Sequence, residues 1–147
     1  MGRGTETERL KALVDSRKLD NVLFYDEIDP KEILSLLSIC HVGLISLDPL
    51  HKSHNVPGKF LSYMQAGLPV LAKINKGTDL ASLIEKEGVG YVYTGGEIYE
   101  FQHLAEELID NKKKLREMSE RGQALSCSMF SSYHAARQIV TSLSSYL

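Results

Sequence analysis

The segment Pro57-Gly58-Lys59-Phe60-Leu61-Ser62-Tyr63-Met64-Gln65-Ala66-Gly67-Leu68-Pro69-Val70-Leu71-Ala72 (residues 57–72) decides the fold of this chain. Proline is favoured in the first turn of a helix, because the amide hydrogen that it lacks has no helical acceptor there. Glycine is favoured just past the last turn. Pro57 and Gly67 therefore predict the start and the end of one helix, and a Leu68-Pro69 turn leads into a strand at 70–74.

Apolar runs and helical periodicity alternate on both sides of this segment. Strands are expected at residues 21–28, 42–47, 70–74 and 89–93. Helices are expected at residues 29–39, 57–66, 78–86, 98–109 and about 115–125. Two further helices are expected to begin at residue 5 and at about residue 132. The run 42–47 lacks clean alternation, which predicts a strand buried on both faces. Alternation of strands and helices implies β-α-β units with a parallel sheet. The sequence thus predicts a Rossmann-like α/β fold, a three-layer α/β/α arrangement, as one domain over residues 1–147.

The amino-acid composition excludes several classes of binding partner and cofactor for this chain. The chain has 147 residues, 43% of them hydrophobic, a net charge of −2 and two cysteines. This charge balance argues against nucleic acid or an anionic membrane as a partner. No CxxC pair, no zinc spacing and no apolar run of about 20 residues occurs, so we expect no metal, no cofactor and no transmembrane segment. Two unpaired cysteines and the lack of a signal peptide predict a cytoplasmic location.

The residues from 54 to 59 could form an anion site. Helix amino termini attract anions through their free amides and the helix dipole. Gly58 has no side chain, so nothing at this position would block a phosphate. Lys59 places a positive charge in the first turn, where the helix dipole disfavours it and where a bound anion would compensate it. The loop follows a predicted parallel strand, at the sheet edge where open α/β sheets bind ligands. The alternative is that Pro57-Gly58 only shapes the loop and that Lys59 is solvated.

The same segment resembles a known family. Residues 57–70 are similar to the P-x-K-x-x-E-Y-M-A-x-G-x-P-V signature of family 4 retaining glycosyltransferases, which have the GT-B fold. Further matches are Gly2-Arg3-Gly4 with G-D-G, residues 21–28 with N-V-x-F-x-G-x-V, residues 41–44 with A-D-V-x-L, and Gly88-Val89-Gly90 with G-x-G. The order and spacing of these motifs agree over nearly the whole chain.

The resemblance implies roles for individual residues. The loop that contains Asn55 and the backbone amides near Val56, Gly58 and Lys59 would bind the donor diphosphate, and the backbone near Ile28 would meet the base. The family has two glutamates, one near the transferred sugar and one on the ribose, and this sequence has His54 and Ser62 there. His54 is therefore the candidate catalytic residue, with a solvent-facing loop histidine as the alternative. Ser62 could hydrogen-bond a ribose hydroxyl, without the strength of a carboxylate.

The resemblance also implies an activity. We expect a nucleotide-sugar donor domain, one half of a GT-B enzyme, that transfers a sugar from a UDP-sugar without a metal and with retention. The acceptor would be a lipid-linked saccharide, in the synthesis of bacterial surface polysaccharides such as O-antigen or capsule. The full enzyme would be cytoplasmic and peripheral at the inner membrane. The family's acceptor domain and its basic pair for the diphosphate precede the matched segment, so we expect the chain to be a fragment that is inactive alone. The alternative is a complete small domain with a short sheet.

Two rival functions remain at this point. A nucleotide-sugar epimerase of the same fold would need acidic and basic residues in an interdomain cleft, and the sequence supplies few. A non-enzymatic α/β nucleotide-binding module, such as a receiver, would need aspartates clustered at strand ends. Asp26-Glu27 follows one predicted strand, but no second acidic cluster follows 42–47.

Overall fold

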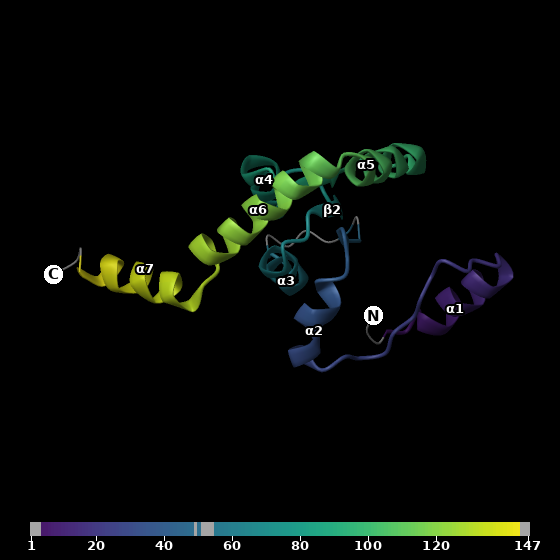
Figure 1. Cartoon of the computed structure of the whole chain (residues 1–147), viewed down its shortest axis with the longest axis horizontal. Coiled ribbons are helices and arrows are strands. Elements are labelled where there is room, and N and C mark those ends of the chain that lie inside the picture. The colour runs from purple at the N-terminus through teal and green to yellow at the C-terminus, as the bar shows by residue number, and fades with distance from the viewer. Residues whose placement is uncertain (1–3, 49, 51–54, 145–147) are drawn as a thin grey trace. The chain divides into compact units, whose positions relative to one another are not determined.

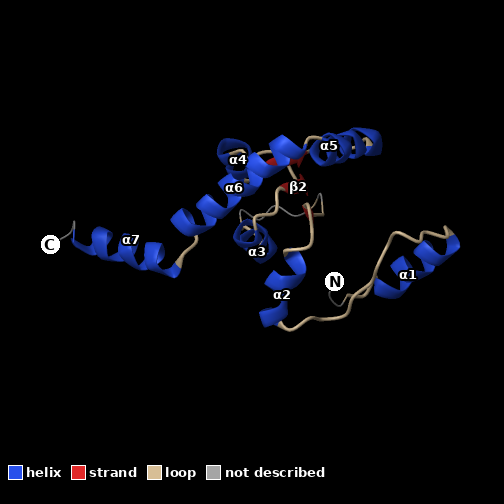
Figure 2. Ribbon diagram, viewed as in Figure 1, coloured by secondary structure: helices blue, strands red, loops and turns tan. Residues whose placement is uncertain are grey.

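The computed structural model describes residues 4–48, 50 and 55–144. The chain forms two compact units, residues 1–35 and residues 36–147. Figure 1 traces the chain, and Figure 2 distinguishes its helices from its short strands, which alternate with helices from residue 43 to residue 93. Within the described residues, no helix is both long and apolar enough to span a membrane.

The first unit contains α1 (Thr7–Ser16) and the beginning of α2 (Pro30–Leu37). The Asp29 carboxylate accepts a hydrogen bond from the Lys31 amide at 2.9 Å, which caps the first turn of α2. The strand predicted at 21–28 is wrong, because residues 22–29 have no regular secondary structure. The side chain of Leu23 is 72% exposed. A strand is stabilised by a paired neighbour and a covered face, so β-prone residues alone do not form one.

The second unit is built on a parallel sheet. Its strands are β1 (Gly43–Ser46), β2 (Val70–Lys73) and β3 (Gly90–Tyr93), in the spatial order β1-β2-β3. Val70 lies opposite Gly43 on one side and opposite Gly90 on the other. The parallel α/β architecture predicted from the alternation is therefore confirmed.

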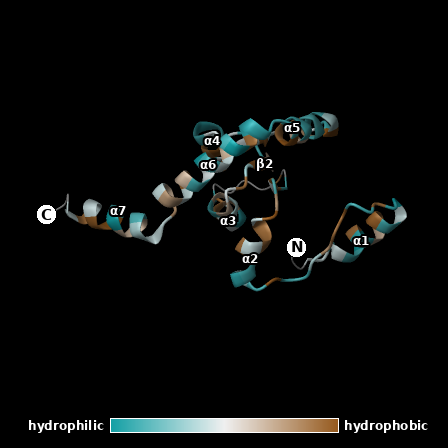
Figure 3. Cartoon of the chain, viewed as in Figure 1, coloured by the Kyte–Doolittle hydropathy of each residue, from teal (hydrophilic) through white to brown (hydrophobic). Residues whose placement is uncertain are grey.

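Two apolar cores cover the two faces of the central strand. Val70 and Ala72 of β2 belong to a larger core that includes Phe60, Met64, Ile84 and Leu125, from α3 (Gly58–Ala66), α4 (Asp79–Glu87) and α6 (Lys112–Met129). Leu71 points the opposite way, into a smaller core with Leu108 of α5 (Ile98–Asp110) and Met118 of α6. Alternate side chains of a strand face opposite sides of the sheet, so these cores define three layers. The chain continues into α7 (Ser132–Ser144), which follows α6 and has no buried residue, and Figure 3 shows hydrophobic and hydrophilic positions mixed along it.

β1 differs from the prediction of a strand buried on both faces. Ile45 is fully buried in the larger core, whereas Leu44 is 52% exposed. β1 is an edge strand, with β2 on one side only. β2 is the strand with both faces covered, since its first three residues are all buried.

The helix predicted at 57–66 is confirmed to within one residue. Pro57 is its N-cap and Gly58 its first residue, and the helix ends at Ala66. Gly67 has φ 70°, a left-handed conformation that disfavours residues with a Cβ atom, and its amide donates to the Met64 carbonyl. Gly67 thus turns the chain toward β2, as expected from its position in the sequence.

Candidate functional site

The candidate site lies at the carboxyl edge of the sheet. All three strands are parallel, so their last residues share one edge. The chain leaves β1 at this edge, and α3 returns it to the amino end of β2 through the turn at Gly67. The amino terminus of α3 therefore lies at the carboxyl edge, where open α/β sheets bind ligands. This confirms the placement predicted for the loop before α3, in its described part.

The first turn of α3 is open to solvent. Pro57 has the extended backbone of an N-cap, with φ −61° and ψ 141°, and its own side chain makes no capping hydrogen bond. A Cβ atom built on Gly58 would have nothing within 4 Å. Val56 packs against the larger core and anchors the loop just before the turn. A helix start that is held in place but uncovered is suited to an anion.

The structure brings together most of the residues predicted from the sequence. Asn55, Gly58 and Lys59 are exposed at the start of α3, next to the half-buried Val56. Ser62 is half-buried, one turn further along, with its Oγ 3.5 Å from the Gly58 carbonyl oxygen. His54 lies outside the described residues. Ile28 is half-buried in the first unit, so its predicted role in binding the base stays a prediction.

The sequence did not reveal a second feature of the same edge. A cavity of 280 Å³ lies where the three strands end, and its lining includes Leu47 after β1, Lys73 and Asn75 at the end of β2, and Thr94 and Gly95 after β3. These residues are far apart in the chain, and their types are common in loops. The sequence feature that these cavity residues share is their position, directly at or after the carboxyl end of a strand.

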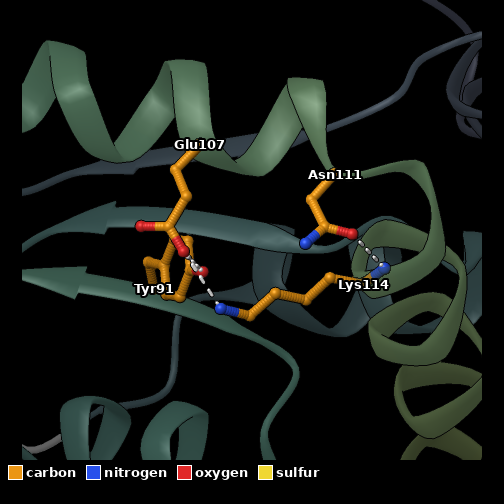
Figure 4. Close-up of polar contacts among 4 residues, drawn as sticks. All are labelled: Tyr91, Glu107, Asn111 and Lys114. Atoms are coloured by element: carbon orange, nitrogen blue, oxygen red, sulfur yellow. Dashed lines mark hydrogen bonds and ion pairs between the residues drawn. The ribbon is translucent and has the colours of Figure 1, made fainter.

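Shifted pKa values often mark functional sites, yet the clearest group of them here has a structural role. On the α5 face of the sheet, the Tyr91 hydroxyl donates to Glu107 at 2.5 Å, and the Lys114 ammonium lies 3.1 Å from the same carboxylate oxygen (Figure 4). The same ammonium stands 4.7 Å from the centre of the Tyr91 ring. Asn111 accepts from the Lys114 amide at 3.0 Å and caps α6. The cluster ties β3, α5 and α6 together.

The pKa shifts follow from these contacts. The hydrogen bonds from Tyr91 and Lys114 lower the pKa of Glu107. Desolvation and the Glu107 hydrogen bond raise the pKa of Tyr91, and the hydrogen bonds to Tyr91 and Glu107 raise that of Lys114. All three groups are already paired with one another, so we assign the cluster to stability rather than to ligand binding.

The cluster predicts a pH dependence of stability. Because the folded pKa of Glu107 is depressed, its contribution is present above the ordinary value of 4.5 and is lost as the pH falls through the folded value. We expect Glu107→Gln to flatten the acid limb of the stability curve below that pH, with a small loss of stability at pH 7. Denaturant unfolding of both proteins between pH 3 and 7 measures this. Parallel acid limbs would contradict the assignment, and Glu106→Gln, on the same helix, is the matched control.

A known family matches most of this chain. The sequence model described as Glycosyl transferases group 1 matches residues 1–125, which include the sheet, the loop before α3 and most of α6. No curated protein and no solved structure matches the chain significantly.

Proposed function

This chain belongs to the group 1 glycosyl transferases, and from that premise we propose that its carboxyl edge binds the donor of a glycosyl transfer, a nucleoside diphosphate sugar. The observation that carries the proposal is the uncovered first turn of α3, with Gly58 open to solvent and Lys59 beside it. Helix amides and a cation at that point are the chemistry that a diphosphate requires.

The catalytic contribution of this site would be electrostatic. Negative charge grows on the diphosphate as the sugar departs, and fixed helix amides stabilise that charge without having to reorganise. Lys59 adds a charge-assisted hydrogen bond, about twice as strong as a neutral one. The proposal assigns the stabilising positive charge to Lys59 and to the helix amides.

The finer assignments rest on the resemblance to the retaining family. We propose a UDP-sugar as donor, retention of configuration, and a lipid-linked saccharide as acceptor, in the assembly of a bacterial surface polysaccharide at the cytoplasmic side of the inner membrane. His54 would contact the transferred sugar, Ser62 would contact the ribose, and Asn55 and Val56 would lie beside the diphosphate with Gly58 and Lys59. A second domain would supply the acceptor site.

Lys59 provides the direct test of the diphosphate site. We expect UDP to bind the wild-type chain weakly, and Lys59→Ala to weaken binding at least tenfold, since a hydrogen bond to a charged group contributes about 1.5–3 kcal/mol. Ser62→Ala should have a smaller effect, because it removes one neutral bond of about 1 kcal/mol. Isothermal titration calorimetry of each variant measures the dissociation constants.

The control is another lysine in the first turn of a helix. Lys112 is the first residue of α6, and Lys112→Ala should leave UDP binding unchanged. If Lys59→Ala binds UDP like the wild type while remaining folded, the lysine is only solvated. Failure of the wild-type chain to bind any nucleoside diphosphate would overturn the proposed function itself.

A further inference from the structure

The cavity at the ends of the three strands is separate in sequence from the start of α3. It has a volume of 280 Å³, near the lower limit of the roughly 300–1,000 Å³ typical of small-molecule sites. A site of this size suits one sugar ring or one oxyanion group and is too small for a whole nucleotide sugar. A ligand of this cavity would therefore be a small chemical group, separate from the diphosphate at the start of α3.

The charge of the lining indicates the sign of that group. Among the described residues that line the cavity, Lys73 carries the only formal charge. Lys73 is half-buried, and no carboxylate of the described residues lies within 4.0 Å of its ammonium. Lys114, by contrast, is paired with Glu107 at 3.1 Å. A cation in the wall with no carboxylate in reach attracts an anionic group more than a neutral or cationic one.

The rest of the lining is neutral and lies on a rigid frame. Asn75, Thr94, Gly95 and Gly96 also line the cavity. The Tyr93 hydroxyl donates to the Glu97 carbonyl, and a Cβ atom on Gly95 would meet the Tyr93 hydroxyl at 2.7 Å. The turn after β3 is thus packed closely on a buried tyrosine. The hydrogen bonds between β2 and β3 continue to the carboxyl edge of the sheet, because the Ile74 amide donates to the Tyr93 carbonyl at 3.1 Å.

From this cavity we infer a second anion site, in which Lys73 binds an oxyanion group, a carboxylate or a phosphate, of a substrate. The identity of the ligand rests on the proposed function: the group would be the carboxylate of an acidic sugar or a phosphate on the carrier of the acceptor. The existence of the anion site does not depend on that function. Lys73 is then a specificity-determining residue, because a neutral group would leave its charge uncompensated.

Residue-resolved NMR of the whole 147-residue chain tests the inference. The probes are inorganic phosphate, glucuronate and, as a neutral comparison, glucose. We expect phosphate or glucuronate to shift the backbone amide signals of Asn75, Gly95 and Gly96, and glucose to leave them in place. Lys73→Met keeps the length of the side chain without its charge and should weaken this binding at least tenfold, whereas Lys73→Arg should retain it.

Lys76→Met is the matched control, since Lys76 is exposed and lies three residues further along, outside the lining. A response to glucuronate alone would identify a carboxylate as the ligand group, and a response to phosphate alone a phosphate. Equal binding by wild type and Lys73→Met, or no shift of the cavity signals with either anion, would overturn the inference. UDP titration of the same samples separates the two proposals, because shifts at Gly58 and Lys59 report the donor site independently.

Discussion

Gly90→Ala is expected to destabilise the second unit by about 3 kcal/mol or more, the upper part of the range for overpacking a core. Gly90 is the first residue of β3 and lies opposite Val70 of β2. A Cβ atom on Gly90 would stand 2.0 Å from the Val70 carbonyl oxygen. That oxygen belongs to the backbone of the central strand, so it cannot move aside as the tip of a side chain could.

Relief of this clash would have to separate β3 from β2 at the point where the Val70 amide donates to the Val89 carbonyl at 3.0 Å. Gly96→Ala is the matched control, because a Cβ atom there has nothing within 4 Å. Urea unfolding of wild type and both variants gives the free energies. A Gly90→Ala protein as stable as the Gly96→Ala protein would show that the two strands are not as close as the structure places them.

Gly58→Leu is expected to reduce UDP binding at least 100-fold, or about 2.7 kcal/mol, while the domain stays folded. A diphosphate can reach the first-turn amides of α3 only if no side chain stands over them. Gly58 meets this condition, since nothing lies within 4 Å of a Cβ atom built on it. A leucine would occupy that space, and it would also favour the helix by close to 1 kcal/mol relative to glycine.

Two measurements separate loss of the site from loss of the fold. Thermal unfolding should give Gly58→Leu a melting temperature equal to or above that of the wild type. Uridine, which lacks phosphate, should bind wild type and variant equally weakly, so the difference between the proteins should appear only with UDP. Undiminished UDP binding by a folded Gly58→Leu protein would place the diphosphate elsewhere.

The alternation of elements in the second unit was predictable, because its signals are local. Pro57 marks the helix start by lacking an amide hydrogen, and Gly67 marks its end by adopting a left-handed backbone. The Thr78 side chain caps α4 by accepting from the Ala81 amide at 3.3 Å. Each of these effects acts within a few residues of chain. Periodicity likewise located α5, α6 and α7 close to their observed positions.

The strand predicted at 21–28 failed for a physical reason of another kind. Residues such as Val22 and Phe24 are suited to a sheet, but a strand exists only where a neighbour supplies the ladder. The prediction for β1 failed in the same way, since the exposure of Leu44 depends on which helices cover the sheet. The composition of a segment shows whether it is suited to a strand. Whether the strand forms, and which of its faces is buried, depends on neighbouring strands and helices from other parts of the chain.

By itself, then, the sequence determined the parallel α/β class, the helix start at Pro57 to within one residue, and the order of the loops at the carboxyl edge. Tertiary structure alone placed Lys73 beside the turn after β3 and joined Tyr91 to Glu107, residues 16 positions apart. Caps and periodicity act over one or two turns, and their free energy is set locally. A cavity or an ion pair depends on the distance between side chains that only the packing of the strands and helices fixes.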